Sequence, residues 1–171
     1  MSANIVLTGL MGAGKSTVGK LLSKQLKNYT FVDVDEVIVD LEEMSIPEIF
    51  AQKGEPYFRE LEKKVVSELS EEENLIIALG GGAYEDETNR ENLAENGDVF
   101  YLKSTVERLL SRIKDDNSRP LLQCDNPKGK LEELLEKREP NYLKADYVID
   151  TESLSISEIA EKIINILEEA E

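Results

Sequence analysis

The chain of 171 residues fits one domain, and its 40% content of hydrophobic residues is enough for a sizeable core. Its 36 acidic and 20 basic residues give a net charge of −16, which disfavours sequence-independent binding of nucleic acid. The chain contains no histidine, which excludes imidazole base chemistry and His-ligated metals, and its single cysteine, Cys124, excludes an intrachain disulfide.

The chain also shows no sign of a membrane or of export. Its first residues, "MSANIVLTGL", lack the basic start and the long apolar run of a secretory signal. No apolar run approaches the roughly 20 residues that span a bilayer. We therefore expect a cytoplasmic monomer that binds small molecules rather than nucleic acid or a membrane.

Short apolar runs and helical patterns alternate along the chain. The short runs are rich in branched or aromatic residues and are bounded by turn formers or charge, so they are predicted as strands at Asn4–Thr8, Thr30–Val34, Leu75–Leu79, Asp98–Leu102 and Tyr147–Ile149. Two of the helical patterns open with a capping box, at Ser45 with Glu48 and at Ser155 with Glu158. Such alternation implies parallel pairing through right-handed crossovers, hence one three-layer α/β domain over residues 1–171.

A P-loop follows the first predicted strand. The stretch "GLMGAGKST" has Gly9, Gly14, Lys15 and Ser16 at the required spacing, and a helical apolar pattern comes directly after it. Glycines let backbone N–H groups approach phosphate oxygens, the helix start adds partial positive charge, and the lysine neutralises the β- and γ-phosphates. The serine hydroxyl can bind magnesium. The sequence thus predicts binding of a nucleoside triphosphate.

The second predicted strand ends in two acids, Asp33 and Asp35, within "TFVDVDEVIVD". If the chain stays extended there, both side chains point to the same face. Asp33 could then bind the water shell of a magnesium ion held by Ser16. The alternative is purely structural, with the acids capping a helix that begins at Glu36.

Two other kinds of P-loop protein, GTPases and ATPases with a Walker B acid, are disfavoured by the later part of the sequence. The run "LIIALGGGA" has Gly80, Gly81 and Gly82 where a Walker B acid is usual, and no Asn-Lys-x-Asp segment is present to read guanine. Three successive glycines indicate close approach of backbone to a ligand, although an ordinary strand-to-helix turn would also explain them. The polar segment 115–130 fits neither helix nor strand and is predicted to be a lid over the site.

Six motifs in order make the chain similar to the shikimate kinase family: "GLMGAGKST", "FVDVDEVI", "GEPYFRELE", "LGGGA", "RPLL" and "KREPNY". The resemblance covers nearly the whole chain. It implies a P-loop kinase fold with a five-stranded parallel sheet, and an acceptor-binding subdomain over about residues 33–61. The implied activity is transfer of the γ-phosphoryl group of ATP to the 3-hydroxyl of shikimate, with one Mg²⁺, in aromatic amino-acid biosynthesis.

The resemblance also implies roles on the ATP side. Lys15 falls on the catalytic P-loop lysine, Ser16 on the magnesium ligand, and Asp33 on the acid that assists magnesium. Arg119 of "RPLL" matches a catalytic lid arginine that reaches the transferring phosphate, and Arg112 corresponds to a residue that stacks near adenine. The implied ATP-binding set is Gly12, Ala13, Gly14, Lys15, Ser16, Thr17, Arg112 and Arg119.

On the acceptor side, the resemblance places Asp35 against the hydroxyls of shikimate as a catalytic residue, either taking the proton or only orienting the hydroxyl. Arg59 and Arg138 match the arginines that hold the carboxylate, and Gly80 to Gly82 match the glycine loop near the ring. This assignment agrees with chemistry, because a guanidinium fork binds a carboxylate bidentately. The family motif commonly has an apolar residue where this chain has Asn141, which leaves the local packing in question.

Structural and functional alternatives remain at this stage. Arg59 lies four residues from Glu55 and three from Glu62, so a surface ion pair would also explain it, and Arg138 beside Glu139 is equally ambiguous. The closest rival function is a gluconate or nucleoside monophosphate kinase of the same fold. A catalytically silent nucleotide-binding module is the alternative from another class.

Overall fold

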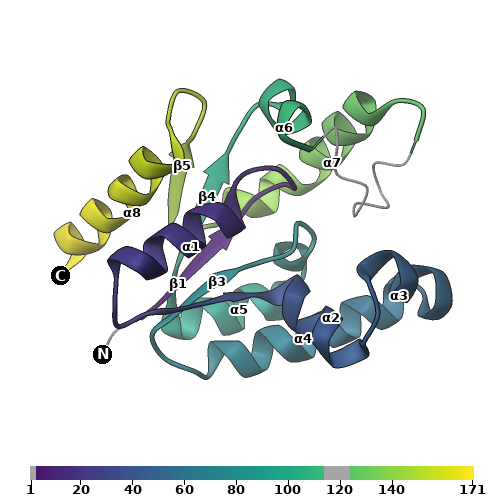
Figure 1. Ribbon diagram of the computed structural model, residues 1–171, viewed down its shortest axis with the longest axis horizontal. Helices are drawn as coiled ribbons and strands as arrows, with labels where there is room; N and C mark the ends of the chain where they lie inside the picture. The colour runs from purple at the N-terminus through teal and green to yellow at the C-terminus, as the bar shows by residue number, and fades with distance from the viewer. Residues whose placement is uncertain (1–2, 114–123) are drawn as a thin grey trace.

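The computed structural model describes residues 3–113 and 124–171, which form one parallel sheet covered by helices on both faces (Figure 1). The strands are β1 (Asn4–Thr8), β2 (Thr30–Asp33), β3 (Leu75–Ala78), β4 (Gly97–Lys103) and β5 (Tyr147–Asp150), in the order β2-β3-β1-β4-β5. Every neighbouring pair is parallel. All five predicted strands and the three-layer α/β fold are confirmed, with strand ends that differ from the predicted ones by at most one residue.

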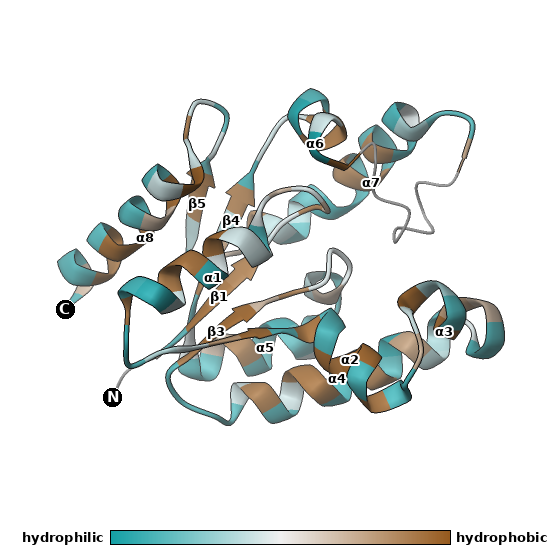
Figure 2. Ribbon diagram, viewed as in Figure 1, coloured by the Kyte–Doolittle hydropathy of each residue, from teal (hydrophilic) through white to brown (hydrophobic). Residues whose placement is uncertain are grey.

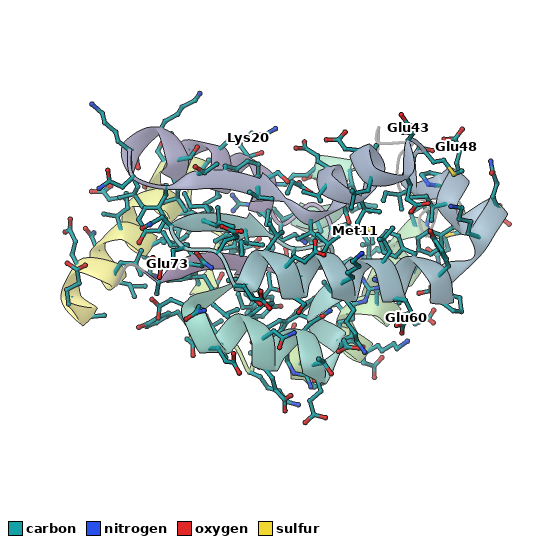
Figure 3. All side chains as sticks on the ribbon, turned by 90° about the horizontal axis from the view of Figure 1, so that it is seen from below. Met11, Lys20, Glu43, Glu48, Glu60 and Glu73 are labelled. Carbon is teal, nitrogen blue, oxygen red and sulfur yellow. The ribbon has the colours of Figure 1, made fainter. Side chains whose placement is uncertain are left out.

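The helices form a layer on each side of the sheet. Helices α1 (Lys15–Gln25) and α8 (Ile156–Ala170) pack together on one face, and α4 (Glu55–Ser70) packs with α5 (Glu87–Asn96) on the other. Figure 3 shows the two layers from below, with Lys20 of α1 and Glu60 of α4 on opposite sides. The remaining elements are α2 (Val34–Glu42), α3 (Ile46–Lys53), α6 (Val106–Ile113), α7 (Pro127–Tyr142) and the short 3₁₀ helix η1 (Ala83–Glu85).

The strands are apolar because both faces of the sheet are covered. Every residue of β1 is buried, and so are Val99 to Leu102 of β4. Figure 2 shows the strands in the colours of hydrophobic residues and the outer faces of the helices in those of hydrophilic ones. A sheet of this kind is rigid, so its carboxyl edge can hold the loops of a site in fixed positions.

Both predicted capping boxes are present. The Ser45 side chain accepts a hydrogen bond from the Glu48 amide while the Glu48 carboxylate accepts one from the Ser45 amide, and Ser155 and Glu158 do the same for α8. These caps satisfy amides that a helix start leaves without partners. They explain why α3 and α8 begin where the sequence indicates.

The predicted lid, 115–130, coincides only partly with the described chain, because residues 115–123 lie outside it. Residues 127–130 were expected to be irregular, but they form the first turn of α7. The Asn126 side chain caps this turn by accepting a hydrogen bond from the Gly129 amide at 3.1 Å, and Pro127 suits a first helical position. Within the described ranges, no helix combines the length and the apolar character that crossing a bilayer requires.

Candidate functional site

The P-loop leaves the carboxyl end of β1 and leads directly into α1. Gly9, Gly12 and Gly14 have φ angles of 148°, 82° and 95°, a region that residues with side chains rarely adopt. Gly14 precedes the helix and offers no side-chain cap, so the first amides of α1 remain available to a ligand. The Lys15 ammonium donates hydrogen bonds to the carbonyls of Gly9 and Leu10. The loop therefore has the geometry of an anion cradle with a cation beside it.

Helix α6 lies against this loop. A Cβ atom on Gly12 would come within 2.7 Å of a methyl carbon of Ile113, so only glycine fits. Arg112 is exposed and donates from Nη1 to the Gly12 carbonyl oxygen at 3.1 Å. This contact places the guanidinium of Arg112 at the P-loop, whereas Arg119 lies outside the described residues.

Asp33 joins the P-loop to the neighbouring strand. Its Oδ2 accepts a hydrogen bond of 2.6 Å from the Ser16 hydroxyl, and its Oδ1 accepts bonds from the amides of Asp35 and Glu36 at 2.9 and 3.3 Å. Asp33 is thus the N-cap of α2, so the structural alternative is correct for this residue. The same carboxylate also lies beside the hydroxyl of Ser16.

The expectation that Asp33 and Asp35 share one face of a strand was wrong. Strand β2 ends at Asp33 and α2 begins at Val34, so Asp35 lies in the first turn of a helix. The cause is the cap itself, because Asp33 stabilises a helix start as soon as the chain can turn. Asp35 nevertheless faces the site, since its Oδ1 would be 2.8 Å from a Cβ placed on Gly80.

A cavity of 540 Å³ lies between the P-loop edge of the sheet and helices α2 to α4. Its volume suits a small molecule. One part of its wall is apolar and comes from α2, α3 and α4, and another part is charged. The lining residues are Met11, Asp33, Asp35, Glu36, Val39, Asp40, Ser45, Ile46, Pro47, Phe50, Phe58, Arg59, Glu62, Gly80, Gly81, Gly82 and Arg138. Met11, labelled in Figure 3, is itself buried and connects this cavity to the P-loop.

The charged side chains of the cavity wall lie close against three successive glycines. A Cβ on Gly80 would lie 2.8 Å from Asp35 and 3.2 Å from Glu62, one on Gly81 would lie 3.0 Å from Arg138, and one on Gly82 would lie 2.5 Å from Arg59. None of these glycines has a positive φ, so their role is close approach rather than an unusual backbone shape. Each glycine makes room for a different charged group.

Arg59 is held by two carboxylates of its own helix. Its Nη1 is 2.9 Å from Oε1 of Glu62, and its Nη2 is 3.3 Å from Oε1 of Glu55. The pair with Glu62 does not lie at the surface, since Glu62 is only 1% exposed. Two-point support of this kind fixes the direction of the guanidinium before a ligand arrives.

Glu62 is a buried, charged member of the cavity wall to which the sequence analysis gave no role in the site. Burial raises the pKa of its carboxyl, the guanidinium of Arg59 opposes this rise, and the charge of Asp35 adds to it. Its Oε2 has no hydrogen-bond partner among the described residues. Helical spacing could have revealed it, because Glu62 falls on the buried face of α4 with Phe58, Val65 and Val66.

Arg138 reaches the cavity from α7 and is 6% exposed. Such burial is unusual for arginine and excludes the simple surface pair with Glu139. Glu139 instead lies 3.8 Å from the ammonium of Lys103 and accepts a hydrogen bond from Tyr101 at 3.3 Å. Arg59 and Arg138 therefore bring two guanidinium groups to one cavity from helices far apart in the sequence.

The oxygen ligands available suit magnesium in its usual, partly hydrated form. The described residues contain no cluster of three or more His, Cys, Asp or Glu side chains able to enclose a metal. Ser16 and Asp33 do supply a hydroxyl and a carboxylate 2.6 Å apart at the start of α1. Magnesium in nucleotide sites commonly takes one or two protein oxygens and completes its shell with water and phosphate.

The comparisons agree with this geometry. A family model described as shikimate kinase matches residues 11–168. Shikimate kinases from Thermodesulfovibrio yellowstonii and Vibrio parahaemolyticus are 45% and 43% identical to this chain, over 94% and 97% of its length and 92% and 96% of theirs. The solved shikimate kinase from Acinetobacter baumannii, in complex with shikimate, has a TM-score of 0.96 and 41% identity, covering 100% of this chain and 96% of that one.

More distant structures share only the fold. A gluconokinase from Sinorhizobium meliloti has a TM-score of 0.64 at 18% identity. The match to the shikimate kinase from Acinetobacter baumannii, by contrast, covers the whole chain at 41% identity. This chain belongs to the shikimate kinase family.

Proposed function

We propose that the chain transfers the γ-phosphoryl group of ATP to the 3-hydroxyl of shikimate, giving shikimate 3-phosphate and ADP. The observation that carries this proposal is the cavity beside the P-loop, which combines the guanidinium groups of Arg59 and Arg138 with the carboxylate of Asp35. An acceptor with a carboxylate at one end and hydroxyls at the other matches that set of charges. Family membership and the shikimate complex of the Acinetobacter baumannii relative support the same acceptor.

On the ATP side, the backbone of the P-loop and the first turn of α1 bind the phosphates. The members of this set are Gly12, Ala13, Gly14, Lys15, Ser16 and Thr17. Lys15 neutralises charge that develops on the transferring group, since its ammonium already lies at the P-loop. Arg112 lies beside the adenine, and Arg119 approaches the transferring phosphate from the lid.

On the acceptor side, Arg59 and Arg138 bind the carboxylate as planar forks. The backbone of Gly80 to Gly82 lies against the ring. Asp35 accepts a hydrogen bond from the 3-hydroxyl and aims its oxygen at the γ-phosphorus. The new P–O bond forms as the bond to the leaving oxygen of ADP breaks, and the hydroxyl proton passes to Asp35 late in a loose transition state.

Mg²⁺ bound with ATP would be held by Ser16 directly and by Asp33 through water. When bound, it neutralises charge on the β- and γ-phosphates. The hydrogen bond of 2.6 Å between the two side chains keeps both oxygens together, and the cap on α2 keeps Asp33 in one orientation.

We extend the proposal to the organisation of the chain. Residues 33–61 act as the acceptor-binding subdomain, because α2, α3 and the first part of α4 supply most of the apolar wall of the cavity. Residues 115–130 act as the lid, and the enzyme works as a cytoplasmic monomer.

A coupled assay of ADP release tests the acceptor. Shikimate, gluconate, AMP and no acceptor are compared at saturating ATP and magnesium. Rapid turnover with shikimate alone is expected. Turnover with gluconate or AMP but not shikimate would replace the proposed acceptor, and nucleotide binding without turnover on any acceptor would indicate a silent module.

A further inference from the structure

The last turn of α7 is tied to the segment that follows the three glycines. Nδ2 of Asn141 donates a hydrogen bond to Oε1 of Glu85 at 3.1 Å, across 56 residues of sequence, and both side chains are half-buried. Next to it, the hydroxyl of Tyr142 donates to the carbonyl oxygen of Gly81 at 2.5 Å. Two adjacent residues of α7 thus hold two points of one loop.

Of the two residues of α7 that make these contacts, Tyr142 is held more firmly by its surroundings. It is fully buried, and its ring stacks on Tyr101 with 5.0 Å between centroids. Burial raises the pKa of Tyr142 to about 12, with Arg138 opposing and Glu85 reinforcing the rise. The hydroxyl therefore keeps its proton at neutral pH and remains a donor to Gly81.

The last turn of α7 needs support from outside the helix. Pro140 lies inside α7 and has no amide proton, so one backbone hydrogen bond is missing just before Asn141. Arg138 is three residues before Asn141, which places the two on neighbouring positions of the same helix face. A contact that holds Asn141 therefore limits movement of the turn that carries Arg138.

At the other end, Glu85 is rigidly connected to the glycines. It is the last residue of η1, and its amide donates to the Gly82 carbonyl at 3.2 Å, while the Ala83 amide donates to Gly80 at 3.1 Å. Neither Glu85 nor Asn141 lines the cavity. Both lie one turn away from residues that do.

We propose that the Asn141–Glu85 hydrogen bond, which acts alongside the contact between Tyr142 and Gly81, positions Arg138 and the glycine loop for the acceptor carboxylate. Asn141 and Glu85 are positioning residues that do not touch the acceptor. Asn141, the polar residue that departs from the family motif, thus has a hydrogen-bond partner in Glu85. This inference rests on the proposed acceptor site and adds a pair to it.

The test uses Asn141→Leu, Glu85→Met, Glu85→Gln and the double variant Asn141→Leu/Glu85→Met. Asn141→Leu and Glu85→Met should each raise the KM for shikimate by about three- to tenfold, the effect of losing one hydrogen bond of ordinary strength. Their kcat and their KM for ATP should stay within about twofold, since the P-loop is untouched. Glu85→Gln keeps Oε1 as an acceptor and should behave like the parent enzyme. The double variant should be no worse than either single one.

Glu136→Met serves as the matched control, because Glu136 is an exposed residue of the same helix, and thermal unfolding checks the fold of every variant. Unchanged KM for shikimate in Asn141→Leu and Glu85→Met would overturn the proposal. So would an equal loss in Glu85→Gln and Glu85→Met, or additive losses in the double variant. If the parent enzyme itself fails to use shikimate, the proposed function is at fault rather than the positioning pair.

Discussion

Gly82→Ala should damage acceptor binding through a single contact. The backbone of Gly82 has φ −95° and ψ −7°, which alanine adopts without strain. Its new Cβ would stand 2.5, 2.6 and 2.7 Å from Nη2, Nη1 and Cζ of Arg59, where ordinary contacts begin near 3.4 Å. The guanidinium must therefore retreat by about 1 Å.

That retreat is large on the scale of the contacts that hold Arg59. Its Nη1 is 2.9 Å from Glu62, so a shift of this size breaks the hydrogen bond and moves the fork away from the acceptor carboxylate. We expect the KM for shikimate to rise about 10- to 100-fold, as for a lost charge-assisted contact or a misplacement of about 1 Å. Because Glu62 is buried and loses its cation, the free energy of unfolding should fall by about 1–3 kcal/mol.

Initial rates with shikimate varied at saturating ATP measure the first effect, and urea unfolding measures the second. Arg59→Ala supplies the control, since in that background Gly82→Ala has nothing to displace and should add little. The reasoning is refuted if Gly82→Ala keeps the parent KM, or if it costs as much with Arg59 absent as with it present.

The remaining predictions concern the acids of the site. Glu62→Gln should change how stability depends on pH: because burial raises the pKa of Glu62 above its ordinary 4.5, its favourable contribution exists below that value and is lost as pH rises through the folded pKa. The stability of the parent enzyme relative to Glu62→Gln, measured by urea unfolding, should therefore fall as the pH rises above about 4.5, and a constant difference would contradict this. Asp33→Asn retains the helix cap but should need more magnesium for half-maximal rate and recover partly when magnesium is added. Asp35→Asn should lose on the order of 10²–10⁴-fold in turnover without such recovery, so indistinguishable magnesium titrations would remove the distinction between the two acids.

Local signals predicted the frame of this protein well. The P-loop, both capping boxes and the five strands depend on residues close in sequence, and all are confirmed. The prediction was wrong for the residues just after β2, because apolar and acidic residues alternate there as they do in a strand. The same residues also fit a helix, since Val34 and Ile38 lie one helical turn apart, and the cap at Asp33 favours the helix.

The cavity itself depends on contacts that no local pattern contains. Arg59 and Arg138 are charged residues beside acids in the sequence, and only the packing of α4 and α7 around the glycines separates them from ordinary surface pairs. The resemblance to a family implies roles for both arginines, but it does not explain why three glycines stand in a row. That reason lies in three different side chains reaching the same loop from distant elements.

The bare backbone of Gly80 to Gly82 has a consequence for drug resistance. An inhibitor anchored on this loop would contact peptide groups, which mutation cannot change directly. A side chain added at any of the three positions to push the inhibitor out would also press on Asp35, Arg138 or Arg59. Substitutions at this loop would therefore disturb the side chains that we propose bind the acceptor, which makes the loop a favourable anchor for inhibitors that resist such changes.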